Sequence, residues 1–166
     1  MPRRTLPAVA TSLALTAAVG AATAAAAPDR IVPGRSIGAM ALGDERATVA
    51  ARQGDDGVVI ARTPDPAHPG NRNLDAVLVA YPWLSITVRF PTDEASTGAT
   101  VVATRSARYR TAAGVGVGAT RAALLSAHPA VKCTGNACRL APGAGRKVTR
   151  FTLANGRVVR VAVSAK

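Results

Sequence analysis

Apolar and polar residues alternate regularly in the segment 84–90, which reads Leu-Ser-Ile-Thr-Val-Arg-Phe. Successive side chains of a strand point to opposite faces, so the four apolar residues of this segment share one face. Arg89 then points to the other face. The pattern predicts a half-buried strand with an outward arginine.

Strand-forming residues bounded by turn-forming ones predict seven further strands. They cover residues 57–63, 75–81, 100–109, 131–134, 137–140, 147–153 and 157–164. Tyr81-Pro82-Trp83 predicts a tight turn between two of them. The segment 63–73 contains three prolines and predicts a long loop.

The last two of these segments predict a hairpin with a definite register. A two-residue turn at Asn155-Gly156 would pair Phe151 with Arg160, which sets an aromatic ring against a charge on the core face. A three-residue turn with Gly156 left-handed pairs Phe151 with Val159 and keeps the apolar residues of both strands together, so we predict this register. Three side chains then point to solvent: Arg150, Thr152 and Arg160.

A short pattern recurs at a spacing of 75 residues. Residues 43–49 read Gly-Asp-Glu-Arg-Ala-Thr-Val, and residues 118–124 read Gly-Ala-Thr-Arg-Ala-Ala-Leu. The same spacing aligns Ile86 with Val161. Each copy predicts a glycine followed by a short helix. The predicted helices are 44–52 and 119–127.

The ends of both predicted helices carry suitable residues. Asp44, Glu45 and Thr120 fall in the first turns, where free N–H groups and the helix dipole favour them. Gly54 and Pro129 end the two helices.

Two copies of one supersecondary unit are the simplest explanation of the repeat. We therefore predict an α+β fold in which two tandem copies of a helix-plus-antiparallel-strands unit form one sheet. Residues 28–109 make up the first unit and residues 110–166 the second. Both share one globular domain, which suits a chain of 166 residues.

The N-terminal segment, residues 1–27, predicts a secretory signal peptide. Arg3 and Arg4 precede an uncharged stretch that ends in Ala25-Ala26-Ala27. A membrane anchor is the alternative, but a stretch dominated by Ala, Thr and Gly would insert weakly. We expect cleavage after Ala27, and a secreted product without a transmembrane anchor.

Export determines what the two cysteines are expected to do. Cys133 and Cys138 enclose Thr-Gly-Asn-Ala, a turn-forming tetrapeptide between two predicted strands. Outside the cytoplasm such a pair is expected to form a disulfide across a hairpin. The bond would stabilise the fold by about 2 kcal/mol. A metal site would need more ligands, and a redox pair usually has C-x-x-C spacing.

Charge is divided unevenly along the chain. Residues 28–94 hold nine acidic and seven basic side chains, whereas residues 95–166 hold twelve basic and no acidic ones. Two interpretations stay open. The cations either form a solvated surface that keeps the protein soluble, or they face an acidic partner.

The sequence holds few groups for catalysis. His68 falls in the predicted loop, and Ser126 and His128 point to different sides of a helix end without an evident nucleophile or carboxylate partner. Residues 114–119 match G-x-G-x-x-G/A, but a dinucleotide site also needs an acidic residue downstream, and none follows Glu94. We expect no catalytic residue, metal or cofactor.

Residues 34–49, with Gly54 after them, resemble the opening motif of small exported bacterial domains. They read Gly-Arg-Ser-Ile-Gly-Ala-Met-Ala-Leu-Gly-Asp-Glu-Arg-Ala-Thr-Val, and the motif is an Ile-Gly-x-x-x-Leu-Gly run before a helix. The segment is similar to the unit of the tandem-repeat β-lactamase inhibitor proteins and of the SmpA/OmlA outer-membrane assembly lipoproteins. The inhibitor resemblance implies helices on one face of a shared antiparallel sheet, whose opposite, concave face binds another protein.

We therefore predict a secreted, non-enzymatic binding protein, an inhibitor or interaction module for another extracytoplasmic protein. The candidate contacts are Asp65 in the loop 64–73, Tyr81, Trp83, Arg89, Arg150 and Arg160. One alternative is a basic protein that binds a polyanion such as an envelope polymer; specific reading of nucleic acid is not expected, because stacking aromatics are few. A hydrolase with an unrecognised site is the second alternative.

Overall fold

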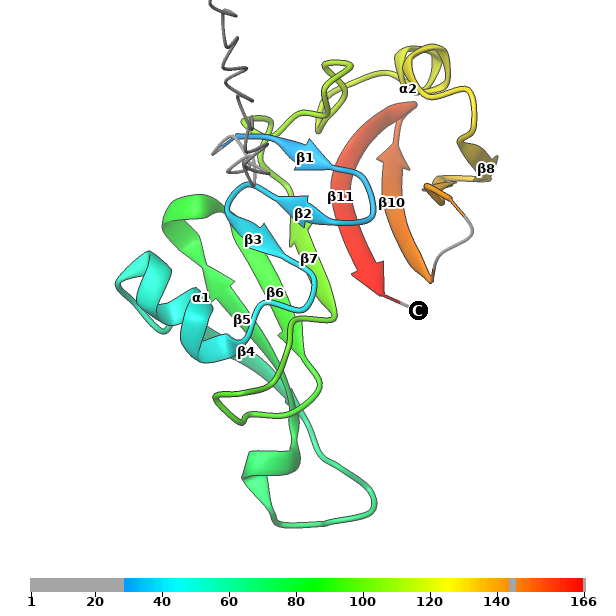
Figure 1. Ribbon diagram of the computed structural model, residues 1–166. Coiled ribbons are helices and arrows are strands. Elements are labelled where there is room, and N and C mark those ends of the chain that lie inside the picture. Colours follow the sequence, from blue (N-terminus) through cyan, green and yellow to red (C-terminus); the bar gives the residue numbers. More distant parts are fainter. Residues whose placement is uncertain (1–28, 144–145, 166) are drawn as a thin grey trace, which may run out of the picture.

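An eight-stranded antiparallel sheet forms the body of the protein (Figure 1). The computed structural model describes residues 29–143 and 146–165, so the predicted signal peptide lies outside the described residues. The strand order is β4-β5-β6-β7-β11-β10-β9-β8, two four-stranded meanders that meet at the β7–β11 pair. The strands are β4 (Val58–Thr63), β5 (Ala76–Tyr81), β6 (Ile86–Phe90), β7 (Val101–Thr104), β8 (Lys132–Thr134), β9 (Ala137–Leu140), β10 (Lys147–Ala154) and β11 (Arg157–Ala165).

One face of this sheet is buried along both meanders. Val79, Val88, Val102 and Val163 lie directly opposite one another on four successive strands and are fully buried. Side chains on alternate positions of a strand share a face, so the apolar alternation predicted from the sequence builds a continuous core across the sheet. The α+β fold with one shared antiparallel sheet is confirmed at this level.

Two helices and a small sheet complete this core. They are α1 (Arg46–Gln53), α2 (Arg121–Ala127), β1 (Ile31–Val32), β2 (Ser36–Ile37) and β3 (Met40–Ala41). Val49 of α1 and Leu124 of α2 are buried in the same hydrophobic core as Ile31, Ile37 and Met40. The small sheet lies in front of β7 and β11 in Figure 1. It was not predicted.

The helices keep the spacing of 75 residues. Gly43 and Gly118, with φ of 87° and 90°, each precede a helix by three residues. Thr120 caps α2 as predicted, since its Oγ1 accepts a hydrogen bond from the Ala123 amide at 3.1 Å. Asp44 lies before α1 rather than in its first turn, and its carboxylate accepts from the Ala41 amide at 2.9 Å.

The spacing does not hold for the strands. Ile86 of β6 and Val161 of β11 both lie opposite Thr104, one on each side of β7. These two strands therefore flank a common neighbour instead of occupying corresponding places in the two meanders. The alignment of Ile86 with Val161 reflects a shared face and not an equivalent position.

Two predicted strands are shorter than expected. The strand predicted at 84–90 begins only at Ile86. The residues before it form a 3-10 turn, η2 (Pro82–Leu84), and Ser85 has a φ of 52°. The strand predicted at 100–109 ends at Thr104. The Thr104 hydroxyl accepts a hydrogen bond from the Ser106 amide at 3.0 Å and so starts a turn. Tyr109, predicted at its end, is instead buried, and its hydroxyl donates to the Leu84 carbonyl at 3.0 Å.

The predicted register of the last hairpin is wrong. Asn155 and Gly156 form a two-residue turn with φ of 51° and 72°, and Phe151 pairs with Val161 rather than with Val159. Val159 is an extra residue in β11, a bulge that is 40% exposed. The bulge lets the favoured turn and the apolar pairing coexist, a solution that a regular ladder does not offer. As predicted, the Arg160 side chain points away from the core face.

The predicted disulfide joins Cys133 and Cys138. The two residues pair directly across β8 and β9, with their Cα atoms 4.0 Å apart. Cys138 is buried beside Phe151, its neighbour on β10. The bond thus closes the outer hairpin of the second meander.

Candidate functional site

The face of the large sheet opposite the core carries five cations that form no salt bridge with any described residue. We call it the open face. It includes the side chains of Leu78, Ala80, Thr87, Arg89, Val101, Ala103, Lys132, Arg139, Val148, Arg150, Thr152, Arg160, Ala162 and Ser164. Its centre is made of small residues, and its cations lie toward both sides.

Three cations lie side by side on the open face. Arg150 pairs directly with Arg139, and Arg139 pairs with Lys132 on the edge strand. We call these three the cationic row. None of them forms a salt bridge within the part of the chain that the structure describes. Like charges directly opposite each other destabilise a sheet, so the row costs stability in the free protein.

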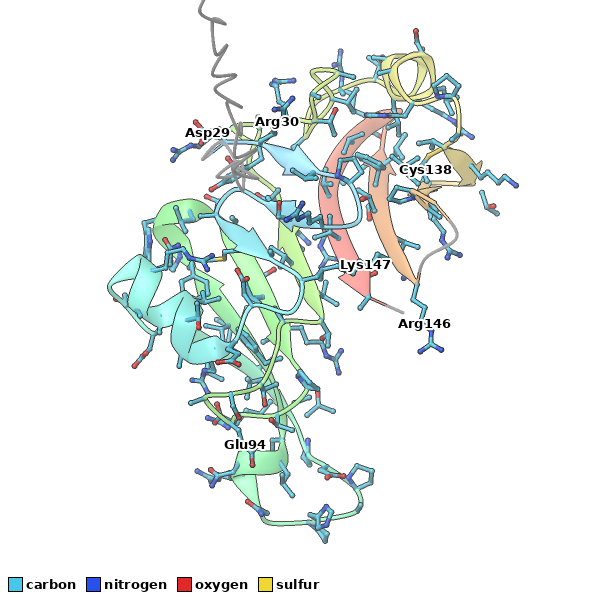
Figure 2. All side chains as sticks on the ribbon, viewed as in Figure 1. Asp29, Arg30, Glu94, Cys138, Arg146 and Lys147 are labelled. Atoms are coloured by element: carbon cyan, nitrogen blue, oxygen red, sulfur yellow. A yellow bond between two sulfur atoms is a disulfide. The ribbon has the colours of Figure 1, made fainter. Side chains whose placement is uncertain are left out.

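Acidic side chains gather elsewhere. Glu94, the last carboxylic side chain in the sequence, lies in the loop after β6, apart from Arg146 and Lys147 at the start of β10 (Figure 2). In the first meander, Asp93 takes both Arg46 and Arg62 as partners. The charge split in the sequence therefore becomes a spatial split between the two meanders.

A hollow of about 340 Å³ opens over β5, β6, β7 and β11. Ala80, Thr87 and Ala103 line it on three neighbouring strands, and Arg105 and Arg160 flank it. Continuing the β7–β11 register by one residue places these two arginines opposite each other. The hollow has the form of a socket for one protruding side chain, with guanidinium groups at its side.

The structure brings three of the predicted contact residues together. Arg89, Arg150 and Arg160 all project from the open face, on β6, β10 and β11. Arg89 and Arg150 are exposed, and Arg160 is half-buried beside the hollow. The two meanders thus contribute to one surface.

Tyr81, a predicted contact residue, does not present its ring to solvent. Its ring is fully buried on the core face opposite Ile86, and burial raises the pKa of its hydroxyl. Alternation along β5 points the Tyr81 ring to the face opposite the Ala80 side chain, and both residues are among those that line the hollow. Trp83 is 48% exposed in η2 and meets the Tyr81 ring edge-on, with 5.7 Å between centroids.

Asp65 organises its own loop. This loop joins β4 to the 3-10 turn η1 (Arg72–Leu74) and projects below the sheet in Figure 1. One carboxylate oxygen accepts from the Ala67 amide at 2.9 Å, and the other lies 3.0 Å from Nδ1 of His68. Both hydrogen bonds lower the pKa of Asp65, and the one with His68 has the larger effect.

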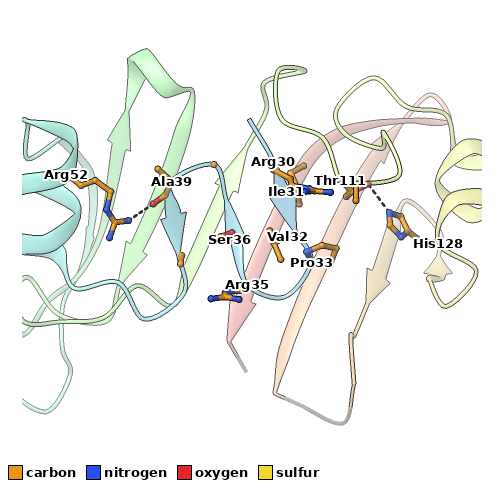
Figure 3. Close-up of a pocket in the computed structure, with 13 residues that line it drawn as sticks. Arg30, Ile31, Val32, Pro33, Arg35, Ser36, Ala39, Arg52, Thr111 and His128 are labelled. Carbon is orange, nitrogen blue, oxygen red and sulfur yellow. Dashed lines mark hydrogen bonds between the residues drawn. The ribbon is translucent and has the colours of Figure 1, made fainter. Parts of the chain in front are cut away.

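A groove that the sequence did not predict crosses the outer face of the small sheet (Figure 3). Its volume is about 680 Å³. Arg52 of α1 stands at one end and His128, after α2, at the other, with Arg30 and Arg35 between them. Two-residue strands carry no periodicity, so no local pattern marks this site.

Both histidines have polar partners, although the sequence showed no evident nucleophile or carboxylate partner for either. His68 contacts Asp65, and Nε2 of His128 lies 3.1 Å from the hydroxyl of Thr111. Within residues 29–143 and 146–165, no three side chains of His, Cys, Asp or Glu cluster as a metal site would require. The same residues include no helix long and apolar enough to span a membrane.

No known protein family and no curated protein matches this sequence. Among solved structures, the chain is similar to an extracellular protein with an SCP domain from Bacillus anthracis, at 10% identity and a TM-score of 0.39 over 75% of this chain and 44% of that one. It is also similar to a DUF4309 family protein from Bacillus subtilis, at 16% identity and a TM-score of 0.38 over 74% of this chain and 79% of that one. The chain spans less than half the length of the first of these proteins.

Proposed function

We propose that this chain is an exported, non-enzymatic binding protein whose open face docks onto an acidic surface of another extracytoplasmic protein. The cationic row carries the proposal. Lys132, Arg139 and Arg150 repel one another across three strands, and a carboxylate-rich partner would remove that cost on binding. The disulfide supports an oxidising compartment, as the predicted signal peptide does.

The hollow favours a protein partner. Interfaces gain most of their energy from a few side chains that fill desolvated pockets, and arginine is common among them. A protruding partner residue would rest on Ala103 between Arg105 and Arg160, while neighbouring carboxylates reach the cationic row. We further propose that the two meanders arose as tandem copies, which is supported by the matching geometry before α1 and α2.

A polyanionic envelope polymer is the second candidate, and the cationic row favours it too. A polymer with evenly spaced charges would engage the row electrostatically, with strong dependence on salt, and would not need the hollow. The two candidates therefore differ in what they require of the hollow.

The test uses charge reversal with a matched control. Arg150→Glu with Arg160→Glu changes the open face, and Arg72→Glu with Arg121→Glu makes the same change in net charge on exposed residues elsewhere. We expect the first pair alone to abolish capture of a partner from the envelope fraction and retention on immobilised polyphosphate. Equal losses from both pairs would mean that only net charge matters, and would overturn the proposal.

Ala80→Phe distinguishes the two partners. The substitution fills the hollow without altering charge. Protein capture should fall by about tenfold or more, the effect of losing one buried anchor, whereas retention on polyphosphate should not change. Unchanged protein capture would favour the polymer.

A further inference from the structure

The small sheet forms the floor of the groove shown in Figure 3. Val32, Ser36 and Ala41 lie directly opposite one another across β1, β2 and β3 and line the groove. Their chain neighbours Ile31 and Met40 are buried in the core beneath, so the floor is held in place by the fold. A volume of about 680 Å³ falls in the range of pockets that hold small molecules, roughly 300–1,000 Å³.

Two of the cations in the groove are free to meet a ligand. Arg52 is already engaged, because its guanidinium contacts the Asp44 carboxylate at 2.9 Å and the Ala39 carbonyl. Arg30 and Arg35 are exposed and form no salt bridge with any described residue. The groove therefore joins a largely apolar floor to uncompensated positive charge.

A peptide strand has no place to pair there. The Ile31 amide donates to the Arg110 carbonyl at 2.8 Å, and the Ala41 amide, at the outer edge of β3, donates to the Asp44 carboxylate at 2.9 Å. Both edges of the small sheet are thus occupied within the chain. Strand addition, the usual way in which a peptide binds a sheet edge, is blocked.

We propose that this groove binds a small amphipathic organic anion. Its carboxylate or phosphate head would be held by Arg30 and Arg35, whose guanidinium groups form charge-assisted hydrogen bonds with such oxygens. Its short apolar body would lie on Val32, Pro33 and Ala41. The site lies on the core side of the large sheet and the open face on the other, so its occupation is independent of the proposed docking partner.

Fluorescence titration with anilinonaphthalene sulfonate, an amphipathic anion that brightens in apolar sites, tests the proposal on the full chain. We expect saturable binding that weakens by about tenfold or more in Arg30→Gln with Arg35→Gln, because two charge-assisted contacts are lost. Phenylnaphthylamine, a neutral dye of similar shape, should bind wild type and variant equally. Unchanged sulfonate affinity in the double variant would overturn the proposal.

Two further variants locate the dye. Ala41→Phe narrows the groove without changing charge and should also reduce affinity, whereas Arg105→Gln with Arg160→Gln, at the hollow of the open face, should not. A loss confined to the hollow variant would place the dye on the open face and overturn the proposal.

Competition distinguishes the sources of the anion. Displacement of the dye by decanoate alone would indicate a free carboxylate ligand, and displacement by phosphatidylglycerol vesicles would indicate a lipid headgroup. Displacement by neither would contradict the proposal.

Discussion

Arg150 illustrates how a single residue can lower the stability of the free protein and yet contribute to a binding surface. It lies between Ala162 on β11 and Arg139 on β9, and Lys132 follows on the next strand. Its side chain is exposed, so water and salt screen the repulsion without removing it. A partner that supplies carboxylates would convert the same contact into attraction.

Arg150→Glu should therefore stabilise the fold while abolishing binding. The new carboxylate would face Arg139, and we expect the free energy of unfolding to rise by about 0.5–1 kcal/mol. Urea denaturation measures the gain, and Arg72→Glu, an exposed change outside the sheet, serves as the control. A variant that is less stable than wild type yet still captures the partner would contradict our account of the cationic row.

The pKa of Asp65 provides a second test at the residue scale. Hydrogen bonds from His68 and the Ala67 amide favour the charged carboxylate, so its pKa is lowered. The stabilising effect is present above the unfolded-state pKa and is lost as the pH falls through the folded-state pKa. His68→Ala should raise the pKa toward its ordinary value in a carbon-13 NMR titration. His128→Ala, which removes the histidine bound to Thr111, should leave it unchanged.

At the scale of elements, the β10–β11 hairpin shows how a bulge reconciles two local preferences. The Asn155-Gly156 turn requires a regular two-residue connection, and the apolar residues require Phe151 to face Val161. Val159 is the extra residue between these two requirements, and bulging it out of the ladder satisfies both.

Deletion of Val159 should leave this hairpin intact. Thr152 would still pair with Arg160, and Phe151 with Val161, so every face is preserved. We expect a change of less than about 1 kcal/mol in the free energy of unfolding. Deletion of Ala162 instead places Val161 and Val163 on opposite faces and should cost at least about 2 kcal/mol. Comparable losses for the two deletions, measured by urea denaturation, would mean that the bulge has a structural role of its own.

At the scale of the whole molecule, the two meanders share one core. β7 and β11 pair at the centre of the sheet, and the Ile31 amide, at the start of β1, donates to the Arg110 carbonyl of the second predicted unit. Val102 and Val163 are buried against each other across this seam. Separation would expose both, together with two unpaired strand edges.

Neither half should therefore fold alone. Residues 29–109 and residues 110–165, produced separately, are expected to lack a cooperative thermal transition by circular dichroism, and mixing them should restore it. The buried seam and the open edges provide the physical reason. A cooperative transition in one isolated half would show that its meander has a sufficient core of its own.

The sequence by itself determined the features that depend on neighbouring residues. Alternation placed nearly all strands of the large sheet, the repeated glycine placed both helices, and spacing placed the Cys133–Cys138 bond. The outward direction of Arg89 and Arg150 followed from the same alternation. Each of these features depends on the repeat of the backbone or on a short loop, and a short stretch of sequence is enough to show it.

Only the tertiary structure decided the features that depend on distant pairing. The small sheet forms because strands of two residues are held by the core and by Arg110. The cationic row exists because β10, β9 and β8 align, and Tyr81 is buried because α1, the small sheet and α2 cover its face of the sheet while leaving the other open. Which face is covered, and which distant strand lies alongside, is settled by the total burial of apolar surface, and no single segment encodes it.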